Sequence, residues 1–196
     1  MNKGLFIVFY GPDGVGKSKQ AGLLLERLRE HKIMSREVRY PVYDQQPSGP
    51  KLDGILHRKK EVMPEEEMQK LFAQNRKEFE PTLKSWLNSG VTVVAQNYKG
   101  TGIVWGVARE LSVEKVEEMN KGTLDSDVTI YIDGPKREEM VEGHPYGQDD
   151  EWYKVRKVYL QIADRYGWVR VEGDAPILTV ANRIWAVVRP VVVSRL

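Results

Sequence analysis

The feature that most constrains this chain is a short apolar run that leads directly into a glycine-rich loop. Residues 5–10 (LFIVFY) have the length and the continuous apolar character of a strand buried on both faces. The next eight residues, 11–18 (GPDGVGKS), match Gly-x-x-x-x-Gly-Lys-Ser, the pattern of a phosphate-binding P-loop. An amphipathic helix is expected after the loop, so the motif has the structural context that it requires.

Each defined position of this loop has a chemical purpose. The glycines at 11, 14 and 16 let the backbone curl, so that successive N–H groups point at phosphate oxygens. Lys17 brings a positive charge to the β- and γ-phosphates, and the Ser18 hydroxyl is a ligand for Mg²⁺. The surrounding strand and helix disfavour the alternative of a chance glycine-rich turn. We therefore predict a nucleotide-binding protein with contacts from Gly11, Pro12, Asp13, Gly14, Val15, Gly16, Lys17, Ser18 and Lys19.

Composition excludes several classes of function. The 196 residues carry 30 basic and 28 acidic side chains without a dominant basic block, which argues against binding to a nucleic-acid polymer. The chain has no cysteine, so disulfides and thiolate metal sites are excluded, and a reducing, cytoplasmic location is expected. No apolar stretch approaches the length of a membrane span, so no membrane association is expected.

Hydrophobic periodicity and turn residues predict alternating strands and helices along the rest of the chain. We expect further strands at 36–40, 91–95, 127–132 and 168–171, and helices at 17–31, 51–60, 64–88, 102–110, 113–120, 150–166 and 175–189. The last of these helices is expected to turn Ile177, Leu178, Ala181, Ile184, Trp185 and Val188 inward. This alternation predicts an α/β fold, with an open, mostly parallel five-stranded sheet and helices on both faces.

The predicted topology brings distant loops together. Residues 1–196 are expected to form a single domain, with a polar lid segment at about 136–149. Ligands of open α/β sheets bind beyond the carboxyl ends of the strands. That rule collects the P-loop, the loop 41–50 and the loop 96–102 into one site.

Four sequence blocks occur in a characteristic order. They are GPDGVGKSKQ at 11–20, RYP at 39–41, LFAQNR at 71–76 and GVTVV at 90–94, and Asp13 is an unusual residue for a P-loop. Together they resemble the thymidylate kinases, a family of P-loop nucleoside monophosphate kinases, over nearly the whole chain. The resemblance implies the P-loop kinase fold, ATP and Mg²⁺ as cofactors, and phosphorylation of a deoxynucleoside monophosphate, most simply dTMP. Members of the family are usually cytoplasmic homodimers.

The resemblance also implies roles for matching residues. Phe72 would stack on the base of the monophosphate, and Arg76 would hydrogen-bond the base edge. Arg39 would hold the acceptor phosphate, and Asp13 would contact the acceptor sugar and phosphate, so that both are catalytic candidates together with Lys17. The remaining expected acceptor contacts are Asn97, Thr101, Gly102 and, at the edge of the lid, Tyr146.

The residues themselves leave alternatives open for some of these positions. Phe72 lies on an apolar helical stripe, so packing in the core competes with base stacking. Arg39 follows a predicted strand, where its planar guanidinium suits bidentate phosphate binding, and a surface salt bridge is the competing interpretation. The histidines His31, His57 and His144 are most simply solvated residues at helix ends or in loops, and we assign them no role.

The chain departs from the family pattern after the third strand. Family members carry Asp-Arg-Tyr or Asp-Arg-His where this chain has Gln96, Asn97 and Tyr98. There the aspartate supports the Mg²⁺–water network, and the arginine bridges the phosphates between which the phosphoryl group moves. Because both charges are missing, we expect slow transfer, and we expect Gln96→Asp with Asn97→Arg to raise kcat.

The second departure concerns the further arginine that the family places in the P-loop or the lid. The variable P-loop positions here are Gly14 and Val15, and the lid segment offers Lys136 and Arg137 at its start. Acidic residues dominate the rest of that segment and its end, namely Glu138, Glu139, Glu142, Asp149 and Asp150. An arginine that stabilises phosphoryl transfer contributes about 10³–10⁵ in rate, so the sequence predicts nucleotide binding more strongly than fast catalysis.

Three interpretations therefore remain. The first, which we favour, is a thymidylate kinase or a close relative that phosphorylates a deoxynucleoside monophosphate with ATP and Mg²⁺. The second is a kinase of the same fold for a different acceptor, to which the neutral Asn97 is an adaptation. The third is a non-catalytic nucleotide-binding protein that keeps the P-loop for regulation or assembly.

Overall fold

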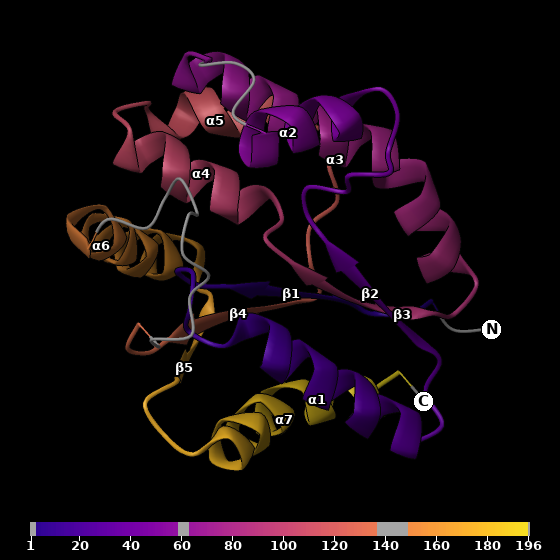
Figure 1. Ribbon diagram of the computed structural model, residues 1–196. Coiled ribbons are helices and arrows are strands. Elements are labelled where there is room, and N and C mark those ends of the chain that lie inside the picture. The colour runs from indigo at the N-terminus through magenta and orange to yellow at the C-terminus, as the bar shows by residue number, and fades with distance from the viewer. Residues whose placement is uncertain (1–2, 59–62, 137–148, 196) are drawn as a thin grey trace.

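The centre of the computed structural model, which describes residues 3–58, 63–136 and 149–195, is a sheet of five parallel strands. The strands are β1 (Phe6–Tyr10), β2 (Ser35–Arg39), β3 (Thr92–Gln96), β4 (Val128–Asp133) and β5 (Val169–Glu172). Their order across the sheet is β2-β3-β1-β4-β5, so β1 lies in the middle (Figure 1). This arrangement confirms the predicted α/β fold.

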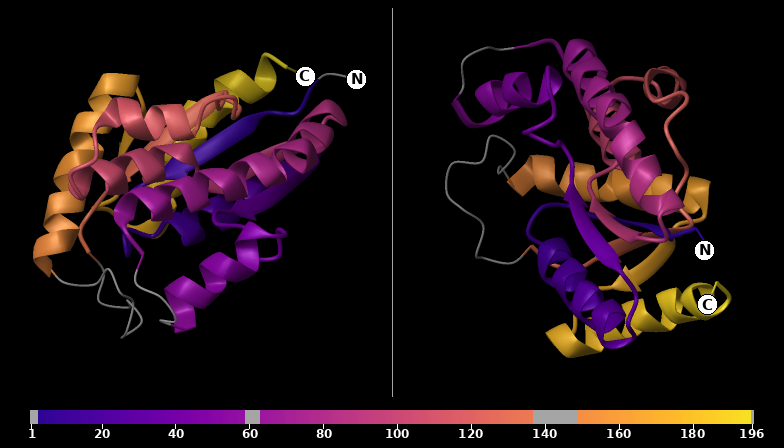
Figure 2. Two further views of the ribbon diagram at one scale, coloured as in Figure 1. Left: turned by 90° about the horizontal axis from the view of Figure 1, so that it is seen from above. Right: turned by 90° about the vertical axis from the view of Figure 1, so that its right-hand side faces the viewer.

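Helices cover both faces of the sheet. They are α1 (Lys17–Glu30), α2 (Ser48–Arg58), α3 (Glu65–Asn88), α4 (Lys99–Ala108), α5 (Val113–Met119), α6 (Asp149–Tyr166) and α7 (Ile177–Val193). Helices α1 and α7 lie on one face, and α3, α4 and α6 lie on the other, as Figures 1 and 2 show. No helix in the described part of the chain is long and apolar enough to cross a membrane.

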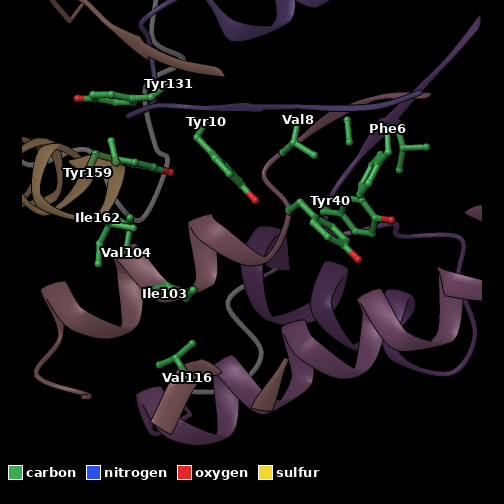
Figure 3. Packing of buried hydrophobic residues seen from close by; sticks show 14 of the residues in the cluster. Phe6, Val8, Tyr10, Tyr40, Ile103, Val104, Val116, Tyr131, Tyr159 and Ile162 are labelled. Atoms are coloured by element: carbon green, nitrogen blue, oxygen red, sulfur yellow. The ribbon is translucent and has the colours of Figure 1, made fainter. Parts of the chain in front are cut away.

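Two apolar cores follow from the pleat of the strands. Successive residues of β1 point to opposite faces, so Phe6, Val8 and Tyr10 pack toward α3, α4 and α6, whereas Ile7 and Phe9 pack toward α1 and α7. Figure 3 shows the first of these cores, with aromatic rings reaching from the sheet toward the helices. Every residue of β1 is buried, as expected for a central parallel strand.

The glycines that suggested a loop at 96–102 belong to a helix. Helix α4 starts at Lys99, so Thr101 and Gly102 lie on its first turns. A Cβ atom at Gly100 would lie 2.5 Å from the Trp168 ring, so the glycine permits close packing between α4 and the rest of the core. The expected loop 41–50 is likewise shorter than predicted, because α2 begins at Ser48.

The predicted inward face of the last helix was partly wrong. Leu178 is 68% exposed, and the buried stripe consists of Val180, Ile184, Val188 and Val192 at intervals of four residues. Helix α7 begins after Pro176 and continues to Val193, so its buried stripe lies further along the chain than the predicted one.

Candidate active site

The loop between β1 and α1 has the backbone geometry of a phosphate cradle. Gly11, Gly14 and Gly16 have φ angles of 147°, 82° and 93°, a region that other residues rarely adopt. Gly16 is the N-terminal cap of α1, so the loop opens directly onto the positive end of that helix. The predicted strand, glycine-rich loop and following helix are therefore all present.

Lys17 closes this loop from the inside. Its side chain is 7% exposed, and Nζ donates to the carbonyl oxygens of Gly11 and Pro12, each at 2.8 Å. Nζ also lies 3.3 Å from Asp13 Oδ1. These oxygens hold the ammonium group in the concave side of the loop, where it can exchange them for phosphate oxygens.

A chain of hydrogen bonds leads from the P-loop to the edge of the sheet. Ser18 Oγ donates to Gln96 Oε1 at 3.0 Å, and Gln96 Nε2 donates to Glu37 Oε1 at 2.6 Å. Arg39 Nε donates to the same Glu37 oxygen at 2.7 Å. Ser18 is exposed, whereas Gln96 is 2% exposed at the end of β3. We call this series, Arg39–Glu37–Gln96, the donor-end chain, because it leads to the P-loop, where the phosphate donor is expected to bind.

These groups fit a hydrated magnesium ion. Mg²⁺ prefers oxygen ligands and keeps several of its waters, and the exposed Ser18 hydroxyl and the Gln96 carbonyl offer two oxygens side by side. Ser18 would hold the ion, and Gln96 would accept hydrogen bonds from its waters.

A cavity of about 180 Å³ lies beside the P-loop. It is lined by Asp13, Tyr40, Pro41, Tyr43, Leu56, His57, Glu65, Gln69, Phe72, Arg76, Asn97, Thr101, Gly102, Trp105, Arg109 and Tyr159. The loops after β1, β2 and β3 contribute Asp13, Pro41 and Asn97, as the rule for ligand sites in parallel sheets predicts. Helices α2, α3, α4 and α6 supply most of the other walls.

The inner wall of this cavity carries a buried cation. Arg76 is 3% exposed and donates from Nη1 to Asn120 Oδ1 at 2.8 Å. Burial lowers its pKa to about 10, so the guanidinium is still charged at neutral pH. Among the described residues, Arg76 Nε has no hydrogen-bond partner, and an unpartnered buried donor is costly unless a ligand satisfies it.

Gln69 is held in place by a second series of charged groups. Its Nε2 donates to Glu65 Oε1 at 2.7 Å, and Glu65 Oε2 accepts from Arg109 Nη1 at 2.8 Å. Arg109 also pairs with Glu151 at 3.0 Å and lies over the Trp105 ring at 5.2 Å. We call this series, Arg109–Glu65–Gln69, the acceptor-end chain, because it leads to the cavity, where the acceptor nucleotide is expected to bind.

Two more polar atoms of the lining are buried without a partner among the described residues. They are Gln69 Oε1 and the Tyr40 hydroxyl. Because Glu65 fixes the amide nitrogen of Gln69, its carbonyl oxygen is left as an acceptor. Burial raises the pKa of the Tyr40 hydroxyl, so that group stays protonated. The residues that line the cavity therefore include buried donors and a buried acceptor without a partner among the described residues.

Gly102 leaves space beside these groups. A Cβ atom at this position would lie 2.8 Å from Arg76 Nη2 and 2.9 Å from Gln69 Oε1. A larger residue would displace both polar atoms, so the glycine lets one donor and one acceptor lie side by side among the residues that line the cavity.

Comparison with known proteins agrees with this geometry. The family model described as "Thymidylate kinase" matches residues 9–184. The chain belongs to the thymidylate kinase family. It is 30% identical over 192 residues to a provisionally named thymidylate kinase of Invertebrate iridescent virus 6, covering 95% of this chain and 89% of the viral one. It is 29% identical over 192 residues to the thymidylate kinase of Fervidobacterium nodosum, covering 92% and 96% of the two chains.

A solved structure shows the same fold. The thymidylate kinase of Candida albicans superimposes with a TM-score of 0.80 at 22% sequence identity, covering 97% of this chain and 93% of that one. The chain is thus a nucleoside monophosphate kinase of the thymidylate kinase family, a phosphotransferase with the P-loop kinase fold.

Most of the site residues expected for a thymidylate kinase come together in this structure. Six of them line the one cavity, namely Asp13, Phe72, Arg76, Asn97, Thr101 and Gly102. Phe72 is half-buried and exposes part of its ring to the cavity, while it also packs beside the small cluster of Leu52, Met68 and Leu71. Its expected roles in stacking and in the core are therefore compatible.

Other predicted positions lie elsewhere. Arg39 is outside the cavity lining, 60% exposed, and paired with Glu37. Lys19 is exposed on the outer side of α1. Tyr146 and most of the expected lid, residues 137–148, lie outside the described residues.

Several residues of the site escaped sequence analysis. Glu37, Glu65 and Gln69 read as ordinary surface polar positions of a strand and a helix, and His57 was assigned no role although it lines the cavity. A signal for Glu37 was present, because residues two apart on a strand share a face. Glu37 and Arg39 had to lie on the same side of β2, next to whatever β3 presents there.

Proposed function

We propose that this protein transfers the γ-phosphoryl group of ATP to dTMP in the presence of Mg²⁺, giving dTDP and ADP. The P-loop supports the donor half of this proposal, because its glycines and Lys17 form a site for the β- and γ-phosphates. The cavity supports the acceptor half, because it adjoins the P-loop at Asp13.

The observation that carries the choice of base is the pair of unpartnered polar groups at the cavity wall. Arg76 offers hydrogen-bond donors, and Gln69 Oε1 offers an acceptor. Thymine presents a carbonyl at C4 beside an N–H at position 3, which matches one donor and one acceptor. Cytosine presents an amino group and a bare ring nitrogen at the same places, so both contacts would be lost.

Phe72 would stack on the base, since an aromatic ring at the cavity wall offers its face to any planar ligand. Arg39 would hold the acceptor phosphate after leaving Glu37, and its high exposure makes that exchange inexpensive. Asp13, half-buried between the P-loop and the cavity, would contact the acceptor beside Lys17.

Transfer in this arrangement depends on positioning and charge. Lys17 stabilises the negative charge on the β- and γ-phosphates, and Mg²⁺ at Ser18 would neutralise further phosphate oxygens. Asn97, at φ 60°, replaces an arginine of the family, so the transferring group has one cation fewer at this place. We expect kcat to lie below the range of about 1–100 s⁻¹ that is usual for kinases.

A coupled assay of ADP release with a panel of monophosphates tests the function directly. We expect turnover with dTMP and dUMP, because uracil has the same edge, and a kcat/KM for dCMP that is at least about tenfold lower. Equal use of dCMP and dTMP would rule out the proposed base contacts. A complete absence of turnover alongside ATP binding would instead favour the non-catalytic alternative.

A modified acceptor tests the Gln69 contact itself. Methylation at N3 of dTMP removes the N–H, so wild-type protein should bind that analogue about tenfold more weakly than dTMP. In Gln69→Leu the difference between the two ligands should nearly vanish. Gln74→Leu, on the exposed side of the same helix, is the matched control and should keep the full difference.

A further inference from the structure

The donor-end chain contains a carboxylate beside an amide that faces the metal position. Glu37 lies on β2, and Gln96 lies at the end of the neighbouring strand β3. One oxygen of Glu37 accepts from Gln96 Nε2 at 2.6 Å and from Arg39 Nε at 2.7 Å. On its other side, Gln96 accepts from the Ser18 hydroxyl at 3.0 Å.

Glu37 fixes the direction of this amide. An ionised carboxylate accepts hydrogen bonds and cannot donate them, so the Gln96 NH₂ group must face Glu37. The carbonyl oxygen of Gln96 must therefore face Ser18. Without Glu37 the amide could rotate and bring its two N–H donors toward a cation, which is the unfavourable orientation.

A P-loop serine alone is a poor magnesium site. P-loop proteins hold the ion with the Ser or Thr of the loop and with an acidic side chain from a neighbouring strand. The residue that reaches Ser18 from the neighbouring strand here is neutral, and its amide donates to the carboxylate of Glu37. Gln96 is almost fully buried between the two positions and the Glu37 side chain is 29% exposed, so solvent screens the charge of this carboxylate only in part.

We propose that Glu37 and Gln96 together perform the task of one acidic metal-site residue. Gln96 provides the oxygen that accepts hydrogen bonds from magnesium-bound water. Glu37 is a positioning residue that orients this amide and contributes the negative charge. The inference rests on the proposed binding of ATP with Mg²⁺ at the P-loop.

Acidic residues at both position 37 and position 96 would be unfavourable in this arrangement. An aspartate at position 96, where the native side chain is 2% exposed, would lie beside the partly exposed carboxylate of Glu37, and two like charges so close together repel each other. Gln96→Asp should therefore be harmful alone and acceptable once Glu37 is neutral. The expected benefit of Gln96→Asp with Asn97→Arg accordingly depends on Glu37.

The test compares nucleotide affinity with and without the metal. ATP binding is measured by calorimetry in EDTA and in excess Mg²⁺, and the ratio of the two affinities is the gain due to the ion. Glu37→Leu should reduce this gain about tenfold while leaving the affinity in EDTA unchanged. Glu37→Gln retains an acceptor without the charge, so its gain should be intermediate. Glu30→Gln, at the exposed far end of α1, is the control and should keep the wild-type gain.

The second arm is rescue. Gln96→Asp combined with Glu37→Leu should restore the gain, whereas Gln96→Asp alone should show a smaller gain and a lower melting temperature than the double variant. Manganese in place of magnesium gives an independent signal, because its electron paramagnetic resonance spectrum reports binding to the protein–ATP complex directly.

The outcomes separate this inference from the proposed function. A wild-type gain retained in Glu37→Leu overturns the role of Glu37 and leaves ATP binding in place. Failure of the wild type to bind ATP under either condition overturns the proposed function and this inference with it. Thermal melts identify any variant that fails to fold, and Glu37→Gln, with the same shape as the native side chain, then decides the question.

Discussion

Each end of the site contains an arginine, a glutamate and a glutamine, and the two arginines differ in how firmly their contacts hold them. At each end an arginine holds a glutamate, and the glutamate orients a glutamine. At the acceptor end, Arg109 is 31% exposed, bridges two glutamates and lies over Trp105. At the donor end, Arg39 is 60% exposed. If the proposed function holds, the restrained chain would suit recognition of a rigid base, and the loosely held arginine could exchange Glu37 for a phosphate.

The two glutamines differ in whether their side-chain oxygens already accept a hydrogen bond. Gln96 Oε1 already accepts a hydrogen bond from Ser18, so the donor end is satisfied before any ligand binds. Gln69 Oε1 has no partner in the described part of the chain, so the acceptor end bears the cost of an unmade hydrogen bond. A ligand contact at the acceptor end would remove this cost, and the following variants compare the two ends.

Lys17→Ala should have the largest effect and should be confined to the donor end. Removal of the ammonium group takes away the P-loop cation, so ATP affinity should fall and turnover should become undetectable. Binding of dTMP, followed by calorimetry without ATP, should change little because Lys17 is outside the cavity lining. Unchanged ATP affinity and turnover in this variant would disprove the P-loop assignment.

Phe72→Leu should come next and act on the acceptor end. Loss of base stacking costs about 1–3 kcal/mol, so the Kd for dTMP should rise about tenfold or more. The ring is half-buried, so a modest loss of melting temperature is expected. A large loss of stability with unchanged dTMP affinity would assign Phe72 to the core instead.

Gly102→Ala should produce a smaller change of the same kind. The added methyl group would approach both Arg76 Nη2 and Gln69 Oε1 to less than 3 Å and would hinder their access to a base. We expect a several-fold rise in the Kd for dTMP, corresponding to about 1 kcal/mol, with ATP affinity unchanged. Gly22→Ala, whose Cβ would meet nothing within 4 Å, is a suitable control.

The smallest effects are expected when Arg109 and Arg39 are replaced, and they should differ between the two variants in the melting temperature. Arg109→Met leaves Glu65 and Glu151 without their shared cation, so the melting temperature should fall by a few degrees for about 1 kcal/mol. Arg39→Met should leave it nearly unchanged, because exposed ion pairs contribute little. Equal losses of melting temperature in the two variants would remove the contrast between a restrained and a loose chain.

The sequence was sufficient for the fold because its signals are local. A buried run before the glycine loop, and apolar runs such as 91–95, predict parallel strands without knowledge of their partners. The boundaries near Gly100 and Gly102 failed because glycine has two uses. It breaks helices in isolation, and it also lets a helix approach a bulky neighbour, here Trp168 and Arg76. Which use applies depends on tertiary contacts that a single sequence does not display.

Part of the candidate site could likewise be predicted from the sequence. Lys17, Phe72 and Arg76 belong to contiguous motifs and could be found by pattern. Glu37 and Glu65 act through glutamines, Gln96 at a distance of 59 residues along the chain and Gln69 at a distance of four. Their importance arises from the direction in which an amide is turned, and residue type and spacing do not encode that direction.

The positions of two indole rings give the molecule an optical property of its own. Trp105 belongs to the lining of the cavity, and Trp152 donates its N–H to the Asp13 carbonyl of the P-loop at 2.7 Å. Indole emission responds to local polarity and to hydrogen bonding. The chain has five tryptophans, so a variant that keeps one of these two and replaces the other four by phenylalanine would report the occupancy of its own half of the site in real time.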